Sequence, residues 1–86
     1  MRLEGKVALI TGAARGMGAS EAKMFANEGA KVAIADVREE DGRKLEAEIT
    51  EIGGEAIFVA LDVTQEDQWE SAVAKVVDQF GKLDIL

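Results

Sequence analysis

The stretch ITGAARGMG, residues 10–18, decides the fold, because it joins an apolar run to a helical pattern through three closely spaced glycines. The apolar run Val7–Thr11 predicts a short buried strand. The helical pattern covers about residues 17–28, and Gly29 is placed to end the helix in the left-handed conformation. A glycine turn between a strand and a helix leaves backbone N–H groups at the positive helix end, where proteins bind phosphate.

The same alternation continues to the end of the chain. Apolar runs predict further strands at residues 31–36, 56–62 and 83–86. A second helix is predicted at residues 39–52, before the glycines at 53 and 54. Thr64, followed three residues later by Asp67, has the spacing of a capping box and predicts the start of a third helix that Gly81 closes.

This order of elements is typical of a parallel α/β fold. Apolar runs without alternation predict strands that are buried on both faces. If the strands step outward from the first and the fourth returns beside it, right-handed crossovers place the third helix on the opposite face from the first two. The carboxyl ends of the first and fourth strands then border a ligand crevice that contains the glycine turn. A flavodoxin-like strand order fits the same pattern.

Composition narrows the classes of function. The 86 residues suffice for one small domain, and 17 acidic against 10 basic residues give a net charge of −7. That charge disfavours nucleic acid and anionic membrane as partners. The chain has no cysteine and no histidine, so we expect no disulfide and no metal site built on these ligands. The short apolar run near the start predicts neither a signal peptide nor a membrane span, and we expect a cytoplasmic protein.

The three glycines have the spacing G-x-x-x-G-x-G, which differs from the G-x-G-x-x-G dinucleotide fingerprint. Gly12 permits a tight exit from the strand, Gly16 lets a pyrophosphate approach the backbone, and Gly18 lets the helix lie close on the sheet. The glycines alone fit an ordinary turn equally well.

Asp36 favours the phosphate-binding interpretation. It ends the second predicted strand eighteen residues after Gly18, close to the spacing of about 20 at which an acidic residue binds the adenosine ribose. A carboxylate there would repel a 2′-phosphate and favour NAD over NADP. Arg15 and Arg38 are the two cations that could meet such a phosphate, and a surface carboxylate beside the second helix is the alternative interpretation of Asp36.

Asp62 and Val63 follow the third predicted strand in the same way. The Asp62 carboxylate could accept a hydrogen bond from an adenine amino group, with the Val63 N–H facing the ring. A strand-end carboxylate beside a capping threonine is the alternative.

Several segments together resemble the short-chain dehydrogenase/reductase family: the opening L-x-GKVALITG, TGAARGMG at 11–18, Asp36, LDVT at 61–64 and GKLDIL at 81–86. The resemblance implies a Rossmann fold, a nicotinamide cofactor and hydride transfer between NAD(H) and a secondary alcohol or ketone. It further implies that the cofactor-binding residues are Gly12, Arg15, Gly16, Met17, Gly18, Asp36, Asp62 and Val63.

Members of that family continue into an Asn-Asn-Ala-Gly segment, a catalytic serine and a Tyr-x-x-x-Lys pair, whereas this chain contains no tyrosine. We therefore expect residues 1–86 to be the N-terminal part of a cofactor-binding domain, cut within the fourth strand and inactive alone. The parent would be a homo-oligomeric, NAD-dependent alcohol dehydrogenase. The alternatives are a non-catalytic dinucleotide-binding module and a fragment that self-associates through the outer edge of its first strand.

Overall fold

A computed structural model describes residues 3–85 of the protein, and strands and helices alternate along them. The elements are β1 Val7–Thr11, α1 Gly16–Asn27, β2 Lys31–Asp36, α2 Glu39–Glu51, β3 Glu55–Ala60 and α3 Glu66–Phe80. The strands form one parallel sheet in the order β1-β2-β3, with Val7 opposite Lys31 and Lys31 opposite Glu55. The predicted α/β alternation is confirmed.

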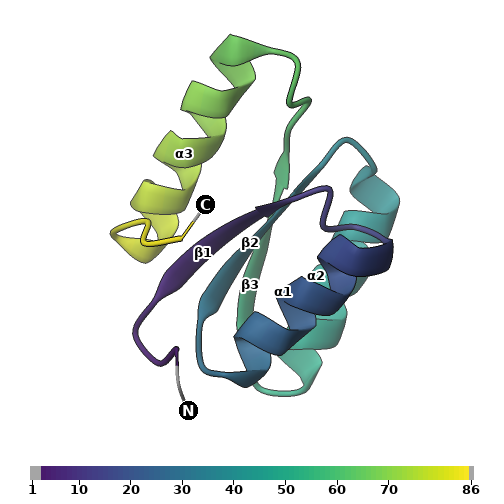
Figure 1. Ribbon diagram of the computed structural model, residues 1–86, viewed down its shortest axis with the longest axis vertical. Coiled ribbons are helices and arrows are strands. Elements are labelled where there is room, and N and C mark those ends of the chain that lie inside the picture. Colours follow the sequence, from purple (N-terminus) through teal and green to yellow (C-terminus); the bar gives the residue numbers. More distant parts are fainter. Residues whose placement is uncertain (1–2, 86) are drawn as a thin grey trace.

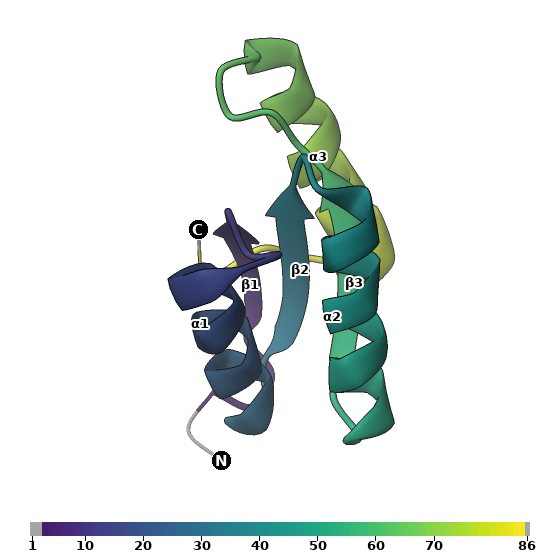
Figure 2. The same cartoon turned by 90° about the vertical axis from the view of Figure 1, so that its right-hand side faces the viewer.

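The helices cover both faces of the sheet, as Figures 1 and 2 show: α1 and α2 lie on one face and α3 on the other. Side chains of β1 alternate between the two layers, as they must along a strand. Ala8 and Ile10 belong to the core under α1 and α2, whereas Val7 and Leu9 belong to the core under α3. Both cores are built mainly from small and β-branched residues.

The end of the described chain returns to β1. Ile85 forms a bridge with Ala8, the Leu9 N–H donates to the Ile85 carbonyl oxygen at 2.8 Å, and the Ile85 N–H donates to the Val7 carbonyl oxygen at 3.0 Å. The strands therefore step outward from β1 to β3 before the chain comes back to the free side of β1. This excludes the flavodoxin-like order. Leu86, the last residue of the predicted fourth strand, lies outside the described residues.

Two local predictions were wrong. β3 is buried on both faces only around Phe58 and Val59, because it is the edge strand of the described sheet. Thr64 does not cap the third helix: α3 begins at Glu66, and its N-cap residue Gln65 makes no side-chain hydrogen bond to it. Thr64 lies one residue before the cap position, and its hydroxyl donates to Asp62 Oδ1 at 2.7 Å.

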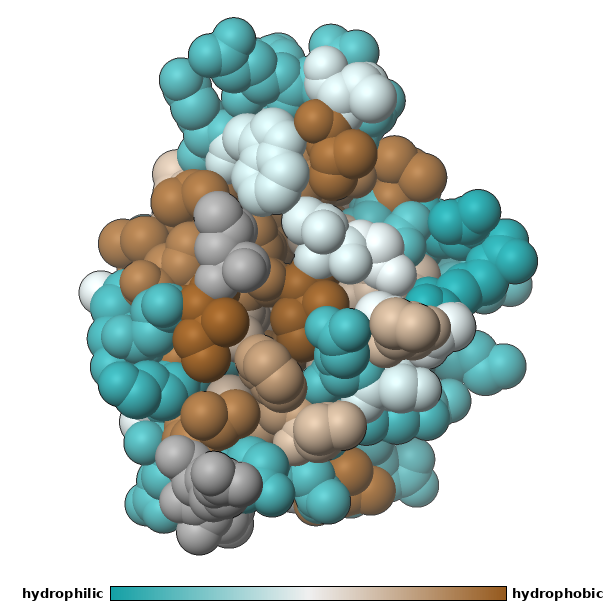
Figure 3. Space-filling model, in the orientation of Figure 1, coloured by the Kyte–Doolittle hydropathy of each residue, from teal (hydrophilic) through white to brown (hydrophobic). Residues whose placement is uncertain are grey.

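Apolar residues gather on the surface over β1 and the neighbouring end of α3, as the space-filling view in the same orientation shows (Figure 3). Over residues 3–85, no helix combines the length and the apolar character that crossing a membrane requires.

Candidate functional site

The turn between β1 and α1 requires glycine for its backbone conformation at two positions. Gly12 and Gly16 have φ values of +61° and +59°, in the left-handed region that side chains with a Cβ disfavour. A Cβ added at either glycine would meet no atom within 4 Å. The space directly above the turn is thus open, and a ligand can approach the backbone there.

Gly18 is required for a different reason, namely close approach. A Cβ at this position would overlap the Gly12 carbonyl oxygen and lie 3.0 Å from Ala13 Cα. We expected Gly18 to let the helix lie close on the sheet. The structure shows that α1 packs against the backbone of the turn itself, which fixes the helix end relative to β1.

Among residues 3–85, no acidic side chain bonds to the N-terminus of α1. The first hydrogen bond within the helix runs from Ala19 N–H to the Arg15 carbonyl oxygen at 3.3 Å, so the N–H groups of Gly16, Met17 and Gly18 precede it. The N-cap residue Arg15 makes no side-chain bond to the helix, and the first turn contains no acidic residue. The first turns of α2 and α3, by contrast, carry three and two acidic residues. This arrangement leaves the positive end of α1 available to an external anion.

Met17 lies at this helix end with 80% of its surface exposed. Of the residues implied by the resemblance, it is the one whose side chain faces solvent most completely.

Asp36 joins β2 to the glycine turn. Only 4% of its surface is exposed, and its carboxylate accepts hydrogen bonds from the Ala14 N–H at 3.1 Å and from the Arg38 N–H at 3.0 Å. The Arg38 guanidinium lies 3.6 Å from the same carboxylate. Each carboxylate oxygen can accept a further hydrogen bond. The sequence predicted a side chain that faces a ligand, but it did not predict the bond to Ala14, because the two residues are 22 positions apart.

These contacts keep Asp36 ionised. Burial by itself raises the pKa of the carboxyl group, but hydrogen bonds from the N–H groups of Arg38, Ala14 and Val37, together with the Arg38 charge, outweigh it and lower the pKa below the ordinary value of 3.8. At neutral pH the site therefore holds a fixed negative charge where β2 ends.

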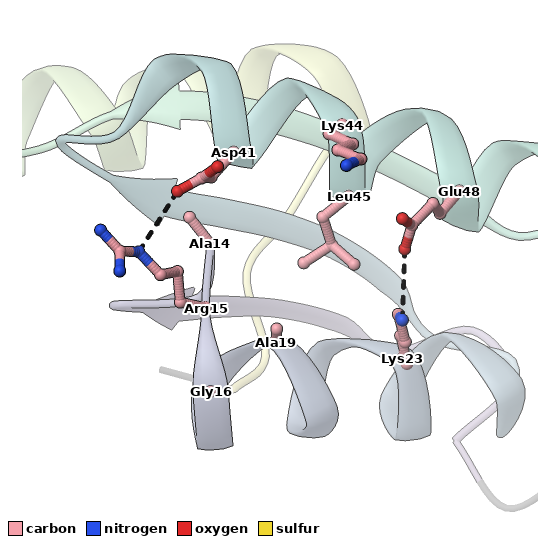
Figure 4. Close-up of a pocket in the computed structure, with 9 residues that line it drawn as sticks. All are labelled: Ala14, Arg15, Gly16, Ala19, Lys23, Asp41, Lys44, Leu45 and Glu48. Carbon is pink, nitrogen blue, oxygen red and sulfur yellow. Dashed lines mark ion pairs between the residues drawn. The ribbon is translucent and has the colours of Figure 1, made fainter.

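Four of the eight residues implied by the resemblance line one cavity of about 370 Å³ at the carboxyl ends of the strands. They are Gly12, Asp36, Asp62 and Val63, and the remaining lining residues are Thr11, Val37, Arg38 and Leu61. Arg15 and Gly16 instead line a second cavity of about 390 Å³ between α1 and α2, on the other side of the turn (Figure 4).

The loop from β3 to α3 is held by side chains that the sequence did not single out for this purpose. Asp62 Oδ1 accepts from the Thr64 N–H at 3.0 Å as well as from its hydroxyl, and both bonds lower the pKa of Asp62. The Asp62 N–H donates to Gln68 Oε1 at 2.8 Å, and Trp69 Nε1 donates to the Val63 carbonyl oxygen at 3.0 Å. An aspartate two residues before a threonine is a turn signal. The roles of Gln68 and Trp69 depend on the orientation of α3, for which the sequence has no signal.

Comparison with known proteins places this geometry in context. The family model described as short chain dehydrogenase matches residues 6–86. A 2,5-dichloro-2,5-cyclohexadiene-1,4-diol dehydrogenase of Sphingobium indicum is 54% identical over 85 residues, which are 99% of this chain and 34% of that protein. A sorbitol dehydrogenase of Cereibacter sphaeroides is 49% identical over 86 residues, which are 100% of this chain and 32% of that protein.

A crystal structure of a hydroxysteroid dehydrogenase from Escherichia coli superposes with a TM-score of 0.96 at 36% sequence identity, over 99% of this chain and 36% of that one. The chain spans about a third of the length of the relatives that it matches.

Proposed function

This chain belongs to the short-chain dehydrogenase family, and we propose that residues 1–86 form the NAD-binding part of an oxidoreductase acting on a secondary alcohol or ketone. The observation that carries the proposal is the buried, ionised Asp36 bonded to the backbone of the glycine turn at Ala14. A carboxylate held beside a helix end that is open to phosphate supports the binding of a dinucleotide, whose ribose and pyrophosphate need these two groups.

The residues present fit a dinucleotide at three points. The open space over Gly12 and Gly16, with the uncapped end of α1, suits a pyrophosphate. Asp36 suits the two hydroxyls of the adenosine ribose, because both carboxylate oxygens retain acceptor capacity. Asp62 and Val63 line the same cavity as Asp36 and suit the adenine ring. Met17 adds a backbone N–H at the helix end.

The proposed substrate class rests on the relatives, which are named as dehydrogenases of a cyclic diol, a sugar alcohol and a hydroxysteroid. When bound, a nicotinamide dinucleotide would supply or accept the hydride that interconverts such an alcohol and its ketone. These 86 residues would bind and orient it. The proton that moves with the hydride needs an acid/base group, which the resemblance implies is a tyrosine; the chain has none, so we expect it to be inactive alone.

The choice of NAD over NADP follows from charge. A 2′-phosphate on the ribose would lie against the fixed carboxylate of Asp36, whose neighbours hold it in the charged state.

Titration of the protein with NADH and with NADPH, followed by nicotinamide fluorescence, tests the proposal. We expect NADH to bind and NADPH to bind more weakly. Equal or tighter binding of NADPH would overturn the role of Asp36, and failure of both cofactors to bind would overturn the assignment of the site.

A further inference from the structure

Both arginines near the proposed ribose site are paired with carboxylates. Arg38 lies 3.6 Å from Asp36, and Arg15 Nε lies 3.2 Å from Asp41 Oδ2. An arginine at this position of a dinucleotide site would otherwise be free to meet a 2′-phosphate. The existing contacts of each guanidinium therefore affect whether the site prefers NAD or NADP.

The pair between Arg15 and Asp41 joins the glycine turn to the first turn of α2, across the cavity of about 390 Å³ (Figure 4). Arg15 directly follows Ala14, whose N–H donates to Asp36, so its backbone lies beside the proposed ribose site. Its side chain, however, pairs with Asp41 in the cavity between α1 and α2, and Arg15 is not among the residues that line the cavity at Asp36. Asp41 is the contact that the structure provides for it there.

The start of α2 beside Arg15 is acidic. Glu39, Glu40 and Asp41 occupy the first turn of α2, three residues after the carboxylate of Asp36. Since a phosphate monoester carries nearly two negative charges at neutral pH, a free Arg15 guanidinium would add to the attraction that Arg38 offers it. An Arg15 paired with Asp41 offers a partly neutralised charge.

We propose that Asp41 is a specificity-determining residue, which favours NAD over NADP by holding Arg15 away from the 2′-position of the adenosine ribose. The inference rests on the proposed function, because it concerns the same cofactor site. Asp41 itself need not touch the cofactor; it acts through Arg15.

The chain contains a matched control. Lys23 Nζ and Glu48 Oε2 form a second ion pair between α1 and α2, also at 3.2 Å and with similar exposure, about two turns farther along α2. Removing that pair takes away the same kind of interhelical contact and the same charge. It leaves the glycine turn untouched, so it controls for effects on helix packing and on overall charge.

The experiment measures dissociation constants for NADH and NADPH with the unmodified protein and with Asp41→Asn, Glu48→Gln, Arg15→Gln and the double variant Asp41→Asn/Arg15→Gln. We expect Asp41→Asn to tighten NADPH binding relative to NADH by about two- to five-fold, the scale of an exposed ion pair. The gain should disappear in the double variant and shrink in high salt, which screens exposed charges. Circular dichroism verifies that each variant is folded.

The two proposals fail differently. If the unmodified protein binds NADH but Asp41→Asn and Glu48→Gln give the same NADPH-to-NADH ratio, Asp41 has no role in specificity and the proposed function stands. A gain that persists in the double variant would also overturn the inference, because it would not pass through Arg15. If neither cofactor binds any variant, the proposed function and this inference both fall.

A second, independent observation concerns the free edge of the sheet at β3. The Phe58 N–H donates to Glu46 Oε2 at 2.7 Å, and Lys75 Nζ donates to the Phe58 carbonyl oxygen at 3.1 Å. Glu46 comes from α2 and Lys75 from α3, so the two side chains reach the same residue from opposite faces of the sheet. The ring of Phe58 also lies under the guanidinium of Arg43, so Phe58 contacts three charged side chains.

These bonds occupy backbone groups that another strand would need. The Leu61 N–H donates to the backbone carbonyl oxygen of Asp36 in β2 at 3.2 Å. Because backbone groups alternate along a strand, those of Ala56, Phe58 and Ala60 point away from the sheet. An open edge of this kind is a template for pairing with a second chain. We infer that Glu46 and Lys75 together block the β3 edge against strand pairing with another copy of the protein.

Hydrogen exchange and sedimentation test this inference. In the unmodified protein the Phe58 amide should exchange about tenfold more slowly than the amides of Ala56 and Ala60, as expected for a bond to a charged acceptor. The variant Glu46→Ala/Lys75→Ala should lose that protection and show a larger increase of sedimentation coefficient with concentration than the control Lys23→Ala/Glu48→Ala. Equal exchange at the three amides, or equal sedimentation of the two double variants, would refute the inference.

Discussion

Replacing Asp36 by asparagine removes one charge and one acceptor from the centre of the site while keeping the size of the side chain. The carboxylate accepts from Ala14 N–H through Oδ2 and from Arg38 N–H through Oδ1. An asparagine has one carbonyl oxygen, so one of these two N–H groups loses its partner. The bond from the Ala14 N–H is buried, so water cannot readily replace it.

Leaving a buried donor without a partner costs about 1–3 kcal/mol. In a domain of this size each kcal/mol lowers Tm by about 4–8 °C. We therefore expect Asp36→Asn to lower Tm by at least about 4 °C at pH 7. Cofactor preference should change in the same variant, since NADPH no longer meets a fixed negative charge and should gain affinity relative to NADH.

The pH dependence identifies the cause of the lost stability. The pKa of Asp36 is lower in the folded protein than its ordinary value of 3.8, so its contribution is fully present above that value and disappears as the pH falls through the folded pKa. The difference in Tm between the two proteins should thus be largest near neutral pH and shrink under acid conditions.

Thermal unfolding followed by circular dichroism measures both effects, with Glu40→Gln as a control that removes an exposed charge from the first turn of α2. The control should change Tm by much less than Asp36→Asn. If the two variants have the same Tm at pH 7, Asp36 does not stabilise the glycine turn in the way its contacts indicate.

Three further outcomes are expected. Gly18→Ala should destabilise the protein more than Ser20→Ala, because a Cβ at Gly18 overlaps the Gly12 carbonyl oxygen whereas Ser20 is an exposed residue of the same helix; equal changes in urea midpoint would contradict this. The free energy of unfolding should decrease in acid, because hydrogen bonds from Lys82 and the Val7 N–H lower the pKa of Asp84, and the stabilisation by its carboxylate is lost as the pH falls below the ordinary value of 3.8. Asp84→Asn should make the free energy of unfolding depend less on pH in this range; the same pH dependence in both proteins would refute the prediction. The protein should self-associate through β1 as its concentration rises through the micromolar range. On the outer edge of β1, only Val7 and Leu9 form backbone bonds within residues 3–85, to Asp84 and Ile85, and the rest of that edge is open to another chain; a sedimentation coefficient that does not change with concentration would count against this.

Local sequence patterns were sufficient for the elements and their order. The glycine positions and the apolar runs predict β1, α1 and β2 to within a residue, because strand burial and helix ends depend on neighbours in sequence. The return of the chain to β1 was one of two strand orders that the pattern allowed, and the bridge between Ile85 and Ala8 decides between them.

Contacts between distant residues were beyond those patterns. The bond between Asp36 and Ala14 determines the orientation of a carboxylate that had been considered only as a ligand group or a surface charge. Thr64 looked like a helix cap, yet α3 begins two residues later at Glu66, and the Thr64 hydroxyl bonds to Asp62 in the preceding turn. The partners of Arg15 could not be anticipated either, since the pair with Asp41 depends on how α1 and α2 pack.

The most direct test of the account is a map of backbone amide shifts by nuclear magnetic resonance as NADH is added to the isotope-labelled protein. We predict the largest changes at the glycine turn and at the ends of β2 and β3, that is at Gly12, Arg15, Gly16, Met17, Gly18, Asp36, Asp62 and Val63. Changes concentrated elsewhere, or no changes at millimolar NADH, would contradict the claim that this turn and this carboxylate hold the cofactor.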